Sequence, residues 1–180
     1  MKRNRMLSTL LVFCLLAMSA AFAEGGFPVT VTDAAGREIV IEDTPEKLVS
    51  GYYISTSVLI ALGLEDKLVG IEAKAKSRPI YALAAPELID LPSVGTAKEF
   101  DMETCLSLEP DLVVLPLKLK DAAATLEEMG VDVLLVNPED LSLLKDTVTL
   151  LSTATGTDGS ALLNFYDKKE AFLTELLADA

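Results

Sequence analysis

Residues 91–116 read LPSVGTAKEFDMETCLSLEPDLVVLP, and this stretch contains two strand-like runs, a short helix and a charged loop. The run Asp111–Leu115 is almost wholly apolar and follows a proline, which is typical of a strand buried on both faces. A shorter run, Pro92–Gly95, stops at a glycine. Ligands of parallel α/β sheets bind beyond the carboxyl ends of the strands. We therefore expect the loop Thr96–Phe100 to belong to a ligand site.

A short helix is predicted between that loop and the second strand-like run. Asp101 is suited to cap it, and its apolar positions are Met102, Cys105, Leu106 and Leu108. Cys105 is the only cysteine after residue 23, so that part of the chain cannot form an intramolecular disulfide. Its apolar surroundings favour a buried, inert thiol over a reactive one.

The first 23 residues are predicted to be a secretory signal peptide. They combine basic residues, an apolar run and small residues at a cleavage site: Lys2, Arg3, Arg5, Met6–Met18 and Ala21-Phe22-Ala23. The apolar run is shorter than the roughly 20 residues of a membrane span. Phe13 precedes Cys14 where a lipoprotein signal needs a small residue. We therefore expect cleavage after Ala23 and a soluble exported protein.

The remaining chain, Glu24–Ala180, is strongly acidic. Of the 15 Lys and Arg residues, 12 lie beyond residue 23. All 28 acidic residues lie there, so the net charge of this part is −16. Such a charge argues against nucleic acids and anionic membranes as partners. Its 157 residues are the length of one domain and can bury an ordinary core without disulfides.

Strand-like and helical patterns alternate along this chain. A β-hairpin is expected first, from Phe27–Thr32 and Arg37–Glu42 around a glycine turn. Five parallel strands are expected at Lys47–Ser50, Lys67–Ile71, Pro92–Gly95, Asp111–Leu115 and Val131–Val136. Five helices are also expected. One is capped by Ser55 or Thr56, and another starts at Asn137-Pro138. The other three cover Pro79–Leu88, Asp121–Met129 and Ser160–Ala180. This order predicts an α/β fold, a parallel doubly wound (Rossmann-like) sheet with an N-terminal hairpin and a long C-terminal helix.

The sequence contains no histidine, which removes much of the catalytic repertoire. Ser-His-Asp and Cys-His arrangements cannot be built, and neither can zinc or haem sites that use a histidine of this chain. The motifs G-x-S-x-G, G-x-x-x-x-G-K-[ST] and G-x-G-x-x-G are also absent. We therefore expect neither an enzyme, nor a metal site, nor a covalently bound cofactor.

Half of the 12 basic residues after residue 23 fall in the loops that follow three of the expected strands. They are Lys74, Lys76, Arg78, Lys98, Lys118 and Lys120. Because these loops share one edge of a parallel sheet, the positive charge converges there. Any one of these residues reads as an ordinary solvated loop cation, but the cluster favours an anionic or acceptor-rich ligand.

Three further side chains stand out: two tyrosines with two possible roles each, and one glutamate at a helix start. Tyr52 and Tyr53 lie in the first loop of the same edge, where they either offer flat surfaces to a ligand or pack against the next helix. Glu103 is suited to the first turn of a helix, where a carboxylate interacts favourably with the helix dipole.

The chain resembles the amino-terminal half of the class III periplasmic substrate-binding proteins of ABC importers. The resemblance rests on the order and spacing of six segments: Val31–Arg37, Leu48–Ser50, Leu62–Gly70, Pro92–Gly95, Asp101–Glu103 and Leu108–Val113. It spans Val29 to about Tyr166. Members of this family take up iron–siderophore complexes, haem or cobalamin in a cleft between two α/β lobes joined by one long helix.

The resemblance implies a role for individual residues. It places Tyr52, Tyr53, Lys74, Thr96, Lys98 and Lys118 on the cleft face. Arg78, from the basic loop cluster, is expected to bind the ligand with them. The resemblance also implies that Glu103 pairs with an arginine of the membrane permease, and such an ion pair contributes docking register more than affinity. Asp101 replaces the family's more usual asparagine and keeps the capping function.

The resemblance also predicts a division of the chain. Residues 1–23 are the signal peptide, 24–156 the N-terminal lobe and 157–180 the start of the interlobe helix. The family's second lobe is absent from the sequence, which stops inside a helix, so we expect a truncated protein or a lobe that works with another chain. The absent lipoprotein signal favours a free periplasmic protein. The alternative is a single-lobe protein-interaction module without transport activity.

Overall fold

The computed structural model describes residues 26–178, so the predicted signal peptide lies outside the described part. The chain begins with an antiparallel hairpin of β1 (Val29–Thr32) and β2 (Glu38–Ile41). Gly36 turns the hairpin with a φ of +76°, a conformation that glycine adopts without strain. The predicted hairpin is confirmed.

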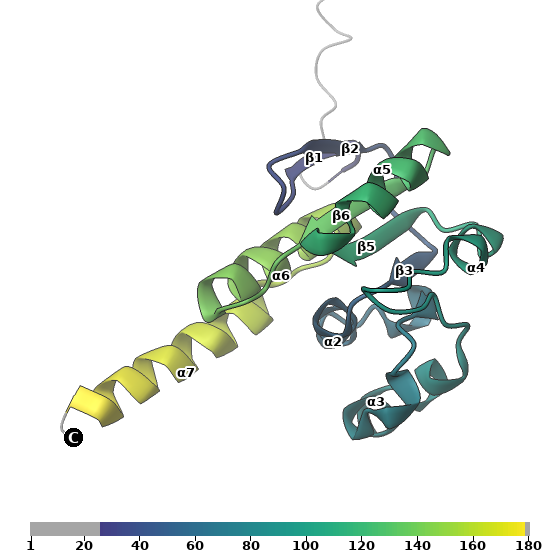
Figure 1. Cartoon of the computed structure of the whole chain (residues 1–180). Coiled ribbons are helices and arrows are strands. Elements are labelled where there is room, and N and C mark those ends of the chain that lie inside the picture. The colour runs from purple at the N-terminus through teal and green to yellow at the C-terminus, as the bar shows by residue number, and fades with distance from the viewer. Residues whose placement is uncertain (1–25, 179–180) are drawn as a thin grey trace, which may run out of the picture.

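A parallel sheet forms the centre of the molecule (Figure 1). Its strands are β3 (Leu48–Ser50), β4 (Leu68–Ile71), β5 (Leu112–Pro116) and β6 (Asp132–Val136). Their order in space is β4-β3-β5-β6, and all neighbours are parallel. The chain starts in the middle, moves to one edge and then crosses to the other side, which makes the sheet doubly wound as predicted.

The predicted strand Pro92–Gly95 is wrong as a full strand. This segment makes one parallel bridge beside β4, between Ser93 and Ile71. Its backbone bonds with β4 are those of Ile71 N to Pro92 O and of Val94 N to Ile71 O. Pro92 has no N–H to donate, and Gly95 leaves the extended conformation at a φ of +83°, so the pairing stops after one bridge.

The described residues form six α-helices. They are α2 (Tyr53–Ala61), α3 (Pro79–Ala84), α4 (Met102–Ser107), α5 (Lys120–Glu128), α6 (Leu141–Thr155) and α7 (Ser160–Ala178). The predicted cap of α4 is confirmed, because Asp101 Oδ1 accepts a 2.9 Å hydrogen bond from Thr104 N. Within residues 26–178, no helix has the length and apolar character that crossing a membrane requires.

Three predicted helix boundaries are wrong. Neither Ser55 nor Thr56 caps α2: both are buried inside the helix, and the Ser55 hydroxyl donates back to the Tyr52 carbonyl. Asp140 rather than Asn137 caps α6, accepting from Leu143 N at 2.8 Å. The predicted helix Pro79–Leu88 divides at Pro86 into α3 and a 3₁₀ segment, Pro86–Asp90, because a proline disfavours helical backbone in the residue before it.

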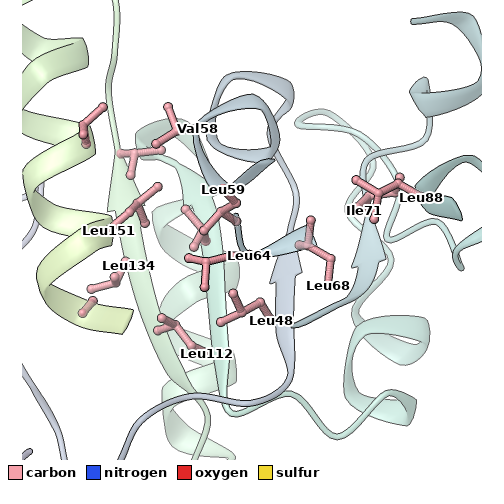
Figure 2. Packing of buried hydrophobic residues seen from close by; sticks show 14 of the residues in the cluster. Leu48, Val58, Leu59, Leu64, Leu68, Ile71, Leu88, Leu112, Leu134 and Leu151 are labelled. Carbon is pink, nitrogen blue, oxygen red and sulfur yellow. The ribbon is translucent and has the colours of Figure 1, made fainter. Parts of the chain in front are cut away.

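The two faces of the sheet carry separate apolar cores, since side chains alternate along each strand. Leu48, Leu112 and Leu134 point to the face covered by α2 and α6, where they pack with Leu59 and Leu151 (Figure 2). Val49, Val113, Leu115, Val133 and Leu135 point to the opposite face, which α4 and α5 cover. All five residues of β5 are buried, which confirms the strand predicted from Asp111–Leu115.

The hairpin covers the free edge of β6. Leu135 N donates to Asp33 Oδ2 at 3.1 Å, and Ala34 N donates to Leu135 O at 2.9 Å. The guanidinium of Arg37 donates to the same buried carboxylate from two nitrogens and to Glu127 from a third. These contacts close an edge that would otherwise expose unpaired backbone groups.

Candidate functional site

A cavity of about 310 Å³ opens at the carboxyl ends of β3, β4 and β5. Four chain segments line it: Gly51–Tyr53, Glu72–Lys74 with Arg78, Gly95–Lys98, and Lys118. The seven side chains predicted to bind ligand all lie among them, namely Tyr52, Tyr53, Lys74, Arg78, Thr96, Lys98 and Lys118. Residues up to 67 positions apart in the sequence therefore meet at one place.

The strand order explains why these loops converge. β3 and β5 are neighbours in the middle of the sheet. The chain goes from β3 to β4 on one side and from β5 to β6 on the other, so the loops after β3 and β5 diverge and leave a crevice between them. Crevices at such a switch in strand order are where open α/β sheets bind their ligands. The cavity lies at this position of the sheet.

The cavity is rich in unpaired positive charge. Within residues 26–178, the ammonium groups of Lys74, Lys98 and Lys118 make no salt bridge or hydrogen bond, and the three side chains belong to exposed residues. Lys76 and Lys120 do not line the cavity, and Lys76 lies 3.6 Å from a carboxylate oxygen of Asp90. The structure thus separates the six basic loop residues into four at the cavity and two outside it.

Two tyrosines and an arginine form an aromatic wall. The rings of Tyr52 and Tyr53 meet edge to face with centroids 5.0 Å apart. The guanidinium carbon of Arg78 lies 4.2 Å from the centroid of the Tyr53 ring, a cation–π contact. Burial, followed by the neighbouring Tyr53, raises the pKa of Tyr52, so its hydroxyl stays a neutral donor at physiological pH.

Sequence reasoning missed a buried carboxylate behind this wall. Glu72 follows β4 directly and its side chain is 7% exposed. Tyr81 Oη donates to Glu72 Oε1 at 2.8 Å, Arg78 Nε donates to the same oxygen at 3.0 Å, and Thr56 Oγ1 donates to Oε2 at 2.9 Å. Burial, followed by the charge of Glu72, raises the pKa of Tyr81 well above its ordinary value. The one available signal was an acidic residue directly after a buried strand.

The loop from Gly95 to Phe100 is held by its own backbone. Thr96 N donates to Glu99 O at 2.9 Å, and Thr96 Oγ1 accepts from the N–H groups of Lys98 and Glu99 at 3.2 and 3.1 Å. The hydroxyl proton of Thr96 is not used by these bonds. Thr96 can therefore donate to a ligand while it shapes the turn that presents Lys98.

A smaller cavity of about 120 Å³ continues along the same sheet edge past Tyr52 and Lys118. It reaches Asn137 and Glu139, in the loop after β6. The edge therefore offers an extended surface that is cationic near Lys118 and carries a carboxylate at its far end.

Glu103 and Cys105 lie on α4, away from the lining of the main cavity. Glu103 is exposed in the first turn, and its carboxylate has no hydrogen-bond or salt-bridge partner within the described residues. Cys105 is fully buried, as predicted, and burial raises the pKa of its thiol to about 11. Among residues 26–178, no group of three or more Cys, Asp and Glu side chains is placed to hold a metal ion.

Comparison with known proteins finds a matching family and a related sequence. The family described as periplasmic binding protein matches residues 48–178. An uncharacterised ABC transporter substrate-binding lipoprotein of Bacillus subtilis, YvrC, is 31% identical over 140 residues, which are 75% of this chain and 42% of that protein.

Solved structures show the same fold. Helicobacter pylori CeuE, crystallised with Ni(II) bound, aligns with a TM-score of 0.74 at 22% identity over 83% of this chain and 50% of its own. A periplasmic haem-binding protein from Pseudomonas aeruginosa aligns with a TM-score of 0.60 at 25% identity, over 75% of this chain and 48% of its own. The chain thus spans about half the length of the relatives it matches.

Proposed function

This chain belongs to the periplasmic binding protein family, and we propose that it is the ligand-capturing lobe of an ABC importer's substrate-binding component. Its ligand is a metal chelate, namely an iron–siderophore complex, haem or cobalamin, which it delivers to the membrane permease. The names of the relatives support this class, because one is an ABC transporter substrate-binding lipoprotein, one binds haem and one was crystallised with Ni(II).

One observation carries the proposal: seven side chains selected by charge, loop position and family resemblance line a single cavity. Its volume of about 310 Å³ lies at the lower end of the range of roughly 300–1,000 Å³ that small-molecule sites occupy. A single lobe would supply only one wall of a cleft, so a modest volume suits this role.

The charges of the cavity indicate how the ligand is recognised. The unpaired ammonium groups of Lys74, Lys98 and Lys118 attract an anionic ligand in a chain whose net charge is otherwise strongly negative. The rings of Tyr52 and Tyr53 add flat, amphipathic surface for a macrocycle or an aromatic chelator. Haem, with its carboxylates and flat macrocycle, matches both features, and so does an anionic siderophore with aromatic chelating groups.

We further propose that residues 24–156 form one lobe and that residues 157–180 begin a helix linking it to a second lobe. The exposed apolar side chains along the last two turns of α7 support this reading. Phe172, Leu173, Leu176 and Leu177 are each more than half exposed. Figure 1 shows α7 running away from the sheet to the C-terminus.

The proposed place of action is the periplasm, where the lobe meets the permease through Glu103. The exposed position of this carboxylate and its lack of a partner within the described residues support a docking role. An ion pair at such a site sets orientation more than affinity.

A ligand screen by thermal shift tests the proposal. Haem, a ferric siderophore complex and cobalamin are each added to the protein, and the melting temperature Tm is measured. A ligand at about 100 times its Kd stabilises by about 2.7 kcal/mol, which raises Tm by about 5–10 °C for a domain of this size. If none of the three raises Tm, the transport role is wrong and a protein-interaction module becomes the better account.

A further inference from the structure

We propose that Glu72 is a positioning residue for ligand binding, which acts by fixing the guanidinium of Arg78 at the wall of the cavity. This inference rests on the proposed function, since it assigns a task to a residue of that same site. It concerns a carboxylate that neither the charge pattern nor the family resemblance singled out.

Both oxygens of Glu72 accept hydrogen bonds from protein groups. Oε2 accepts from Thr56 Oγ1, while Oε1 accepts from Tyr81 Oη and Arg78 Nε. Behind Thr56, the hydroxyl of Ser50 lies 2.8 Å from Oγ1 and extends the network into the buried base of α2. A carboxylate held in this way has little freedom to turn.

Arg78 is held from two directions as a result. Its Nε donates to Glu72, and its guanidinium lies 4.2 Å from the centre of the Tyr53 ring. Tyr81 reinforces the wall, because its hydroxyl also lies 3.1 Å from the Tyr53 carbonyl oxygen. Within residues 26–178, the two terminal nitrogens of Arg78 have no hydrogen-bond partner.

This arrangement leaves a planar fork of N–H donors at the cavity wall with its orientation already set. An arginine fork binds a carboxylate or a similar oxygen pair through two parallel hydrogen bonds. A side chain that is ordered beforehand loses less conformational entropy when the ligand binds. Lys74, Lys98 and Lys118 make no such contacts within the described part of the chain, so Arg78 is the cation whose direction the fold determines.

The mobility of Arg78 in the ligand-free protein tests the positioning directly. Arg37 and Arg78 are the only arginines after residue 23, so the Nε–H signals of a protein processed after Ala23 are two. Arg37 serves as the internal control, because its Nε donates to Asp33 at 2.9 Å. ¹⁵N relaxation is measured in the wild-type protein and in Glu72→Gln, and Arg78→Lys assigns the signal.

We expect both Nε–H groups to be equally rigid in the wild type, and the Glu72→Gln change to make only that of Arg78 mobile. A mobile Arg78 in the wild type, or an unchanged one in Glu72→Gln, overturns the inference. Tyr81→Phe is the substitute variant if Glu72→Gln does not fold. It keeps the charge of Glu72 and removes one of its donors, so it should increase the mobility of the Arg78 Nε–H group by a smaller amount.

A double-mutant cycle then links the positioning to affinity. With haem or an anionic ferric tris-catecholate complex as probe, Glu72→Gln weakens binding on the order of tenfold, as the loss of a charge-assisted bond would. In an Arg78→Ala background the same change causes no further loss, because Glu72 acts through Arg78. An equal loss in both backgrounds shows a merely structural role. If neither probe binds the wild type, the proposed function fails, and the relaxation measurement still decides whether Glu72 fixes Arg78.

Discussion

The backbone N–H of Ala73 donates a 2.8 Å hydrogen bond to the carbonyl oxygen of Gly95. This bond joins the loop after β4 to the loop that carries Thr96 and Lys98, and both loops line the main cavity. The separation of two cavity walls is therefore set by backbone contacts and does not depend on their side chains. The side chains of Lys74 and Lys98 are exposed, but the loops from which they project are fixed.

The first prediction concerns Gly95, whose φ of +83° excludes most other residues and whose added Cβ would collide with the carbonyl oxygen of Glu99. Gly130 is the matched control, because it has a φ of +84° and nothing within 4 Å of an added Cβ. We expect Gly130→Ala to lower the free energy of unfolding by about 1–2 kcal/mol and Gly95→Ala by about 3 kcal/mol or more. Urea unfolding followed by circular dichroism measures both, and equal losses would contradict the collision.

The second prediction concerns the free lysines of the cavity. Because Lys98 and Lys118 are exposed, each should contribute modestly to the binding of an anionic ligand, and Lys98→Gln or Lys118→Gln should weaken it about two- to fivefold. The loss should shrink as salt is added, since screening reduces the contribution of exposed charges. Isothermal titration at two ionic strengths measures this. Lys76→Gln is the control, because Lys76 lies in the loop after β4 but does not line the cavity. An equal effect of that change would show that only the net charge matters.

The third prediction concerns the buried thiol of Cys105. Since burial raises its pKa to about 11, a very small fraction is thiolate at pH 8, and reactivity rises only as the pH approaches that value. In a Cys14→Ser variant, which leaves one thiol, we expect a disulfide reagent to label Cys105 only when the protein unfolds. The absorbance of the released thiol reports the rate in native buffer and in denaturant. Rapid stoichiometric labelling in native buffer would show that the thiol is accessible.

The fourth prediction separates docking from ligand binding. Glu103→Ala should lower ligand-stimulated ATP hydrolysis by the reconstituted permease and leave the Kd for the ligand unchanged, because Glu103 does not line the cavity. Glu128→Ala, at an exposed glutamate on α5, is the control for a general loss of negative charge. Equal losses of coupling and of affinity would remove the docking role from Glu103.

The sheet could be predicted from the sequence because its strands are marked by strong local patterns. The run Asp111–Leu115 is almost wholly apolar and lies between Pro110 and Pro116. In the structure every residue of β5 is buried. The segment Pro92–Gly95 looked similar and failed as a strand, because backbone pairing depends on a free N–H and an extended φ at each end. A short apolar run does not reveal either condition.

The positions of the site residues were also predictable, for a topological reason. Once the strands are parallel, the loops that follow them share one edge, so Tyr53, Lys74, Lys98 and Lys118 are brought together whatever their rotamers. The start of α2 was misjudged because Ser55 and Thr56 resemble caps. In the structure their hydroxyls instead serve the buried network around Glu72.

Glu72 could not be found from the sequence, because its role depends on three partners from two separate parts of the chain. Thr56 comes from α2, Arg78 precedes α3, and Tyr81 lies within α3. No spacing rule relates Glu72 to these three residues. In the sequence, only its position directly after a buried strand distinguishes Glu72 among the chain's 28 acidic residues.

Mapping the bound ligand onto the chain is the most direct test of whether the main cavity is the ligand site. ¹H–¹⁵N spectra are recorded with and without the ligand that raises Tm most in the screen, with gallium replacing iron if it is a ferric siderophore. We expect the largest shifts on amides of the residues that line the cavity, namely Gly51–Tyr53, Ala73, Gly95–Lys98 and Lys118. Shifts concentrated elsewhere, for example on α7 or on the hairpin, would contradict the assignment of this cavity as the ligand site.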